Sequence, residues 1–139
     1  GVLVLRCSVP VKFCHCNIGP SSDDTSRCAR VQSSSGCVWF DECYLNGNGS
    51  SRGLDSSYSA TVSFEHGGIT NQQIAVIAGE SAVVSVAIQV AESISNNTYG
   101  AYVWWGGIIL LAYNTPDLLG GTSNVKNGGI IAKANGTLL

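Results

Sequence analysis

The sequence has no methionine, few charged residues and a long stretch without positive charge. Charged residues make up 12% of the chain, and the net charge is -2. No Lys or Arg occurs between Arg52 and Lys126. A nucleic-acid interface needs clustered basic side chains to neutralise phosphates, and this chain offers none over half its length. We therefore expect no nucleic-acid partner.

The sequence also has features that are typical of secreted proteins. The chain begins at Gly1 without an initiator methionine, which is the pattern of a processed, mature protein. Three Asn-x-Ser/Thr triplets offer candidate N-glycosylation sites at Asn48, Asn96 and Asn135. We expect an extracellular or cell-surface location. The uncharged stretch from Ser93 to Pro116 is too interrupted by glycine for a spanning helix, so we expect no integral membrane segment.

The residues that usually carry catalysis are also scarce. The only histidines are His15 and His66, and the turn around Ser81 lacks the second glycine of a nucleophile elbow. Asp23 and Asp24 lack the spacing of a calcium loop. The sequence therefore predicts no enzyme, no metal site and no cofactor.

Cysteine is present only at the beginning of the chain. No Cys-x-x-Cys pair occurs, which disfavours a zinc site or a redox centre. An even number of clustered cysteines is typical of a disulfide framework, whose connectivity the spacing leaves open. We predict disulfides among all six cysteines, which are Cys7, Cys14, Cys16, Cys28, Cys37 and Cys43.

Alternating apolar and polar residues dominate the chain after Ser57. The ranges 58–65 and 82–90 each place apolar side chains on one face of a strand. We interpret Gly79-Glu80-Ser81 and Gly106-Gly107 as hairpin turns, and 45–57 as an exposed loop. The pattern predicts an all-β fold, an antiparallel β-sandwich or jelly roll with a disulfide-stapled N-terminal segment. We divide it into an extension or connector strand, 1–16, and one sandwich domain, 17–139.

Two apolar regions are candidates for a subunit interface. The N-terminal segment is rich in branched apolar residues and could add a strand to a neighbouring subunit. The adjacent tryptophans of the uncharged stretch point to opposite sides of a regular strand, which would expose one of them. The candidate interface residues are Val2, Leu3, Val4, Leu5, Val9, Val11, Phe13, Trp104 and Trp105.

The segment 62–90, VSFEHGGITNQQIAVIAGESAVVSVAIQV, resembles the sheet of subunits from bacterial endospore appendages. The resemblance lies in the succession of strand, Gly67-Gly68 turn, strand, Gly79-Glu80-Ser81 turn and strand. It implies a jelly-roll subunit of an extracellular fibre, joined to its neighbours by a cysteine-bearing N-terminal connector.

These observations predict an extracellular structural protein that self-assembles into a surface filament or appendage. Strand addition and disulfides would join copies of the chain, its expected partners. One alternative is a secreted, monomeric, lectin-like module that binds glycans through Trp39, Trp104 or Trp105. Another is a pore-forming toxin that inserts the uncharged stretch as a hairpin.

Overall fold

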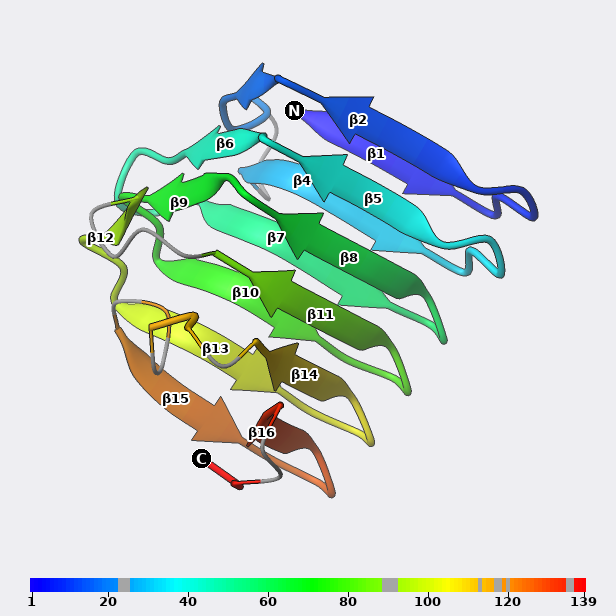
Figure 1. Ribbon diagram of the computed structural model, residues 1–139, viewed down its shortest axis with the longest axis vertical. Coiled ribbons are helices and arrows are strands. Elements are labelled where there is room, and N and C mark those ends of the chain that lie inside the picture. Colours follow the sequence, from blue (N-terminus) through cyan, green and yellow to red (C-terminus); the bar gives the residue numbers. More distant parts are fainter. Residues whose placement is uncertain (23–25, 89–92, 113, 117–118, 120, 135–136) are drawn as a thin grey trace.

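A computed structural model describes residues 1–22, 26–88, 93–112, 114–116, 119, 121–134 and 137–139. The chain winds into a β-solenoid of about 5 turns, with its strands stacked along one axis (Figure 1). The all-β prediction is confirmed. The prediction of an antiparallel β-sandwich or jelly roll is wrong, because the strands within each sheet pair in parallel.

Three parallel sheets run along the solenoid. Sheet A contains β1 (Val2–Leu5), β4 (Arg27–Gln32), β7 (Arg52–Ser57), β10 (Ile74–Ala78), β13 (Tyr99–Val103) and β15 (Thr122–Val125). Sheet B contains β2 (Val11–Cys14), β5 (Val38–Asp41), β8 (Thr61–Glu65), β11 (Val83–Ala87), β14 (Ile108–Leu111) and β16 (Ile130–Lys133). The shorter sheet C contains β3 (Asn17–Ile18), β6 (Tyr44–Asn46), β9 (Gly68–Thr70) and β12 (Ile94–Ser95).

The core consists of inward side chains stacked in register from coil to coil. Phe40 lies between Phe13 and Phe64, with ring centroids 5.0 and 6.0 Å away. Such stacking buries apolar surface continuously along the axis, which is how a solenoid acquires a core without a second sheet layer. A second stack of sheet B consists of Val11, Val38, Val62, Val84, Ile109 and Ile131.

The predicted alternation is present in the strands of sheet B. Ala82, Val84, Val86 and Ile88 are buried, as the period of two predicts. Val90, the last member of that predicted face, lies outside the described residues. Side-chain alternation therefore identified the buried face correctly, although it assigned the wrong partners to the strand.

The predicted hairpin turns are corners of the solenoid. Gly79-Glu80-Ser81 leads from β10 in sheet A to β11 in sheet B, and Gly106-Gly107 leads from β13 to β14. Glu80 and Ser81 have φ of 52° and 64°, in the left-handed region. Left-handed residues bend the chain sharply, and here the bend carries it onto the next face of the same coil rather than back along its own sheet.

The predicted exposed loop 45–57 is wrong at both ends. Leu45 and Asn46 belong to β6, and Leu45 is fully buried. The residues from Arg52 onward form β7, an inner strand of sheet A, and Leu54 is fully buried. The predicted strand 58–65 correspondingly begins late, because Tyr58 and Ser59 form a corner with φ of 55° and 59°. Tyr58 is 52% exposed and takes no part in the core.

Two buried amides support the corners between sheets C and A. The Asn97 side-chain nitrogen donates to the carbonyl oxygens of Ile69 and Leu119, both at 3.0 Å. Its oxygen accepts from the backbone N–H of Gln72 at 3.0 Å. The Gln72 side-chain nitrogen in turn donates to the carbonyl oxygen of Leu45 at 3.1 Å. These bonds satisfy backbone groups that the irregular corner would otherwise bury without partners.

The predicted N-terminal extension occupies the first coil of the solenoid. Strand β1 pairs with β4, and β2 pairs with β5. Among the residues that the structure describes, we find no helix with the length and hydrophobicity needed to span a bilayer.

Candidate functional site

The outer face of sheet B carries a cluster of polar and aromatic side chains over its first three strands. Lys12 of β2 is in register with Trp39 of β5, and Asp41 of β5 is in register with Glu65 of β8. Neighbouring strands of a sheet lie about 4.8 Å apart, so side chains at paired positions are close neighbours. The fold thus brings together residues that are far apart in the sequence.

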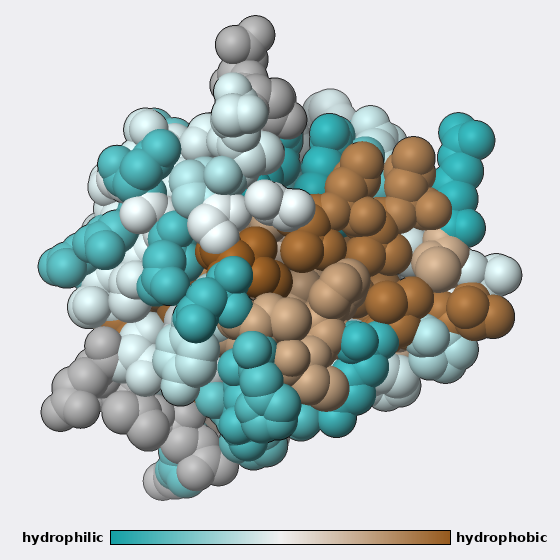
Figure 2. All heavy atoms as spheres, turned by 90° about the horizontal axis from the view of Figure 1, so that it is seen from above, coloured by the Kyte–Doolittle hydropathy of each residue, from teal (hydrophilic) through white to brown (hydrophobic). Residues whose placement is uncertain are grey.

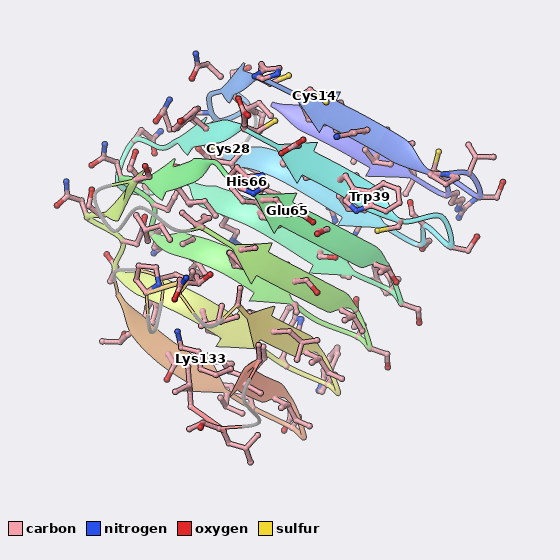
Figure 3. The ribbon with its side chains drawn as sticks, viewed as in Figure 1. Cys14, Cys28, Trp39, Glu65, His66 and Lys133 are labelled. Atoms are coloured by element: carbon pink, nitrogen blue, oxygen red, sulfur yellow. The ribbon has the colours of Figure 1, made fainter. Side chains whose placement is uncertain are left out.

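These residues surround a shallow hollow in the surface. The hollow has a volume of about 320 Å³ and is lined by Lys12, Trp39, Asp41 and Glu65. Figure 3 shows Trp39 and Glu65 on the same sheet, with His66 where β8 ends. The site combines one indole ring, two carboxylates and two nitrogen groups on a rigid surface.

Asp41 is held between two nitrogen groups. Its Oδ2 lies 2.9 Å from Nζ of Lys12, and its Oδ1 lies 3.0 Å from Nδ1 of His66. The hydrogen bond from Lys12, followed by that from His66, lowers the pKa of the Asp41 carboxyl below its usual value. The carboxyl is therefore ionised at neutral pH, and its orientation is defined by both neighbours.

The same contacts favour the charged forms of the partners of Asp41. Hydrogen bonding to Asp41 is the main cause that raises the pKa of His66, and it also raises the pKa of Lys12. Glu65 accepts a hydrogen bond from the Ser63 hydroxyl at 2.6 Å. The side chains of Lys12 and Asp41 are 53% and 31% exposed, so water and solutes reach both groups.

The six cysteines contradict the predicted disulfide framework. All six carry free thiols, with Cys28 and Cys43 buried and Cys14 exposed. The solenoid places the buried thiols at separate points of the core, where Cys28 accepts from Gln72 and Cys43 contacts the carbonyl oxygen of Phe13. Stacked apolar side chains, rather than disulfides, hold the first coils together.

The candidate interface residues lie in two separate places. Leu3, Leu5 and Val9 are exposed on the first coil, with exposures of 63%, 53% and 61%. In the same coil, Val4 is buried, whereas Val2, Val11 and Phe13 are half-buried beside the core.

The tryptophans of the predicted interface lie at the corner after β13, away from the first coil. Trp104 is half-buried and Trp105 is 55% exposed, but the two rings do not point to opposite sides as predicted, because both residues follow the end of β13 and Trp105 has a left-handed φ of 42°. Their rings stack with centroids 5.5 Å apart. They therefore form a surface of their own and do not extend the N-terminal one.

The other predicted positions are distributed over the surface. Asn48 and Asn96 are exposed. Asn135 and the Asp23-Asp24 pair lie outside the described residues. Within the part of the chain that the structure describes, no group of three or more His, Cys, Asp or Glu side chains is placed to hold a metal ion.

Sequence reasoning singled out Trp39 but missed Lys12 and Glu65 as its neighbours. They come from different coils, and the number of residues between paired positions varies from coil to coil, so no fixed period marks them. No protein family, curated protein or solved structure matched this chain.

Proposed function

We propose that this chain is an extracellular structural protein, the subunit of a filament in which solenoids stack end to end. One observation carries the proposal. In the described residues, β1 and β2 have a strand neighbour on one side only, and the apolar core reaches the surface beside them. Figure 2 shows hydrophobic residues gathered at this end of the molecule, between polar flanks.

An uncovered solenoid end is suited to pairing with another strand. Edge strands present unpaired N–H and C=O groups, and terminal coils of solenoids need a polar cap to remain soluble. The half-buried Val2, Val11 and Phe13 provide no such cap. A second copy would cover them.

At the opposite end of the solenoid, the two long sheets differ in the described residues. The last strand of sheet B, β16, is bridged in antiparallel fashion by Leu138 to Ala132, and the Leu139 N–H donates to the Ile131 carbonyl oxygen. In the described residues, β15 has a strand neighbour only on the β13 side. We therefore place β1 of one copy beside β15 of the next. Such a head-to-tail contact does not close on itself and produces a fibre.

One feature supports an extracellular setting for this assembly, and another supports the close stacking of its subunits. The sequon residues Asn48 and Asn96 are exposed, as an N-glycosylation acceptor must be. Charged residues make up only 12% of the chain, so little charge repulsion opposes close stacking.

The proposal is tested on the purified chain by sedimentation velocity and electron microscopy. We expect filaments whose fibre diffraction has a reflection near 4.8 Å along the fibre axis, since strands would lie across that axis. Monomers at all concentrations would refute the proposal.

A backbone variant tests the contact itself. The Arg6 N–H donates to the Gln32 carbonyl oxygen, so by alternation the N–H of Leu3 points to the uncovered side of β1. Leu3→Pro removes that donor without removing a bond to β4, and it should abolish filaments. Leu3→Ala is the control for the lost side chain and should retain them.

A further inference from the structure

The hollow beside Trp39 continues along the solenoid as a groove. A second hollow, of about 450 Å³, shares Glu65 with the first and extends across β11 and β14 to β16. Lys133 lies at its far end, as Figure 3 shows on the lower part of the sheet. The groove therefore crosses successive strands at right angles to their direction. Its lining includes Ser63, Ser85, Ala87, Leu110, Ala112 and Ala132.

The groove exists because side-chain size falls sharply after Trp39. The paired outward positions read Trp39, Ser63 and Ser85 from coil to coil. The two serines leave one side of the bulky indole ring without a neighbour of its own height. The next outward position falls similarly from Glu65 to Ala87. The Trp39 ring thus stands at one end of a mostly apolar channel, whose polar groups are Ser63, Ser85, Glu65 and Lys133.

We propose that this groove binds a neutral oligosaccharide chain laid along the solenoid axis. An indole ring offers an apolar face to the C–H groups of a sugar, while its N–H remains available for a hydrogen bond. Carboxylates accept hydrogen bonds from neighbouring hydroxyls, and an ionised carboxylate has about four acceptor positions. Asp41 uses two of its positions for Lys12 and His66.

The charges of the groove select against other ligands. Asp41 and Glu65 repel a polyanion, while Lys12 beside Asp41 and Lys133 at the far end disfavour a polycation. Coils repeat at about 4.8 Å, a distance comparable to the length of one sugar in an extended chain, so each coil can meet one sugar.

The test is tryptophan fluorescence and calorimetry with neutral oligosaccharides. The probes are glucan, xylan, mannan and chitin oligosaccharides, each from disaccharide to hexasaccharide. We expect at least one series to bind, with affinity that rises with chain length as more coils are occupied. Failure of all four series to bind would overturn the proposal.

Paired tryptophan variants locate the binding. Trp39→Ala should weaken binding about tenfold or more, which corresponds to roughly 1.4 kcal/mol. Trp105→Ala removes an equally large but more exposed ring from another surface and should leave binding unchanged. Equal losses in both variants, or no loss in Trp39→Ala, would contradict the proposed site.

A variant that fills the groove provides a second test in case Trp39→Ala fails to fold. Ser85→Trp blocks the channel while leaving Trp39 and Asp41 in place. It should reduce the affinity of the hexasaccharide to that of the disaccharide. Unchanged length dependence in Ser85→Trp would overturn the proposed path along the axis. The groove lies on the flank of the solenoid, so this binding does not depend on filament assembly.

Discussion

The indole nitrogen of Trp104 lies directly over Gly79. A Cβ built on Gly79 would come within 1.4 Å of Nε1 of Trp104, and the indole N–H is buried without a hydrogen-bond partner among the described residues. The glycine thus provides the space in which the Trp104 ring lies.

The substitution Gly79→Ala should therefore destabilise the protein. Its methyl group would displace the Trp104 ring, at a cost of about 1–3 kcal/mol in the free energy of unfolding. Urea denaturation measures this cost. Gly19→Ala is the matched control, since a Cβ there meets nothing within 4 Å. Adding Trp104→Ala to Gly79→Ala should remove the clash, and strict additivity of the two losses would contradict the proposed contact.

Loss of a ring from the stacked core should be costly. Phe40 is fully buried between Phe13 and Phe64, so Phe40→Ala leaves a cavity inside the stack. We expect a loss of about 3–5 kcal/mol in the free energy of unfolding. Tyr58→Ala, at an exposed corner, should change it by about 0.5 kcal/mol or less. Similar losses in the two variants would argue against the observed register.

Replacing the side-chain NH2 group of the buried Asn97 with an oxygen should destabilise the protein. Asn97→Asp removes the two N–H bonds to the carbonyl oxygens of Ile69 and Leu119. Each buried carbonyl left unpaired costs about 1–3 kcal/mol, so thermal and chemical stability should fall clearly. Asn96→Asp changes the exposed neighbour in the same way and should have little effect. Equal stability of the two variants would refute the role of Asn97 at the corner.

The ionisation of His66 should report its contact with Asp41. The pKa of His66 is raised above 6.5 mainly by this hydrogen bond, and Asp41→Asn should bring it back toward that value. NMR titration of the imidazole resonances measures the change. Glu80→Gln, at a distant corner, should leave the titration unaltered. A His66 titration unchanged in Asp41→Asn would contradict the contact.

The pH dependence of the stability contributed by Asp41 and His66 follows from the directions in which their pKa values are shifted. The folded-state pKa of His66 is raised, so its contribution to stability is present below pH 6.5 and is lost as pH rises through the folded value. The pKa of Asp41 is lowered, so its contribution is present above pH 3.8 and is lost as pH falls through the folded value. The pair therefore stabilises the fold most between these limits.

The cysteines should differ in reactivity according to their place in the solenoid. Cys14 is exposed and should react with iodoacetamide in the native protein, as peptide mass spectrometry would show. Cys28 and Cys43 are buried, and burial raises the pKa of both thiols, so they should react only after denaturation. Native labelling of all three at one rate would contradict this placement.

Several properties follow from the sequence alone. The alternation in 82–88 predicted a strand with one buried face, and Ala82, Val84 and Val86 are buried as expected. The period of two depends only on the geometry of one extended strand, which is the same whatever lies beside it. The all-β class therefore needed no tertiary information, and the same alternation suits parallel and antiparallel sheets equally.

Only the tertiary structure decided which strands are neighbours. A corner such as Glu80-Ser81 resembles a hairpin turn in sequence, and its non-glycine left-handed residues carry no strong signal of their conformation. Because the corner leads to another face rather than back along the same sheet, Asp41 meets Glu65 of the next coil. The groove and the open end of the solenoid depend on that register. Local alternation could determine the strands, whereas the site required contacts between residues that are distant along the chain.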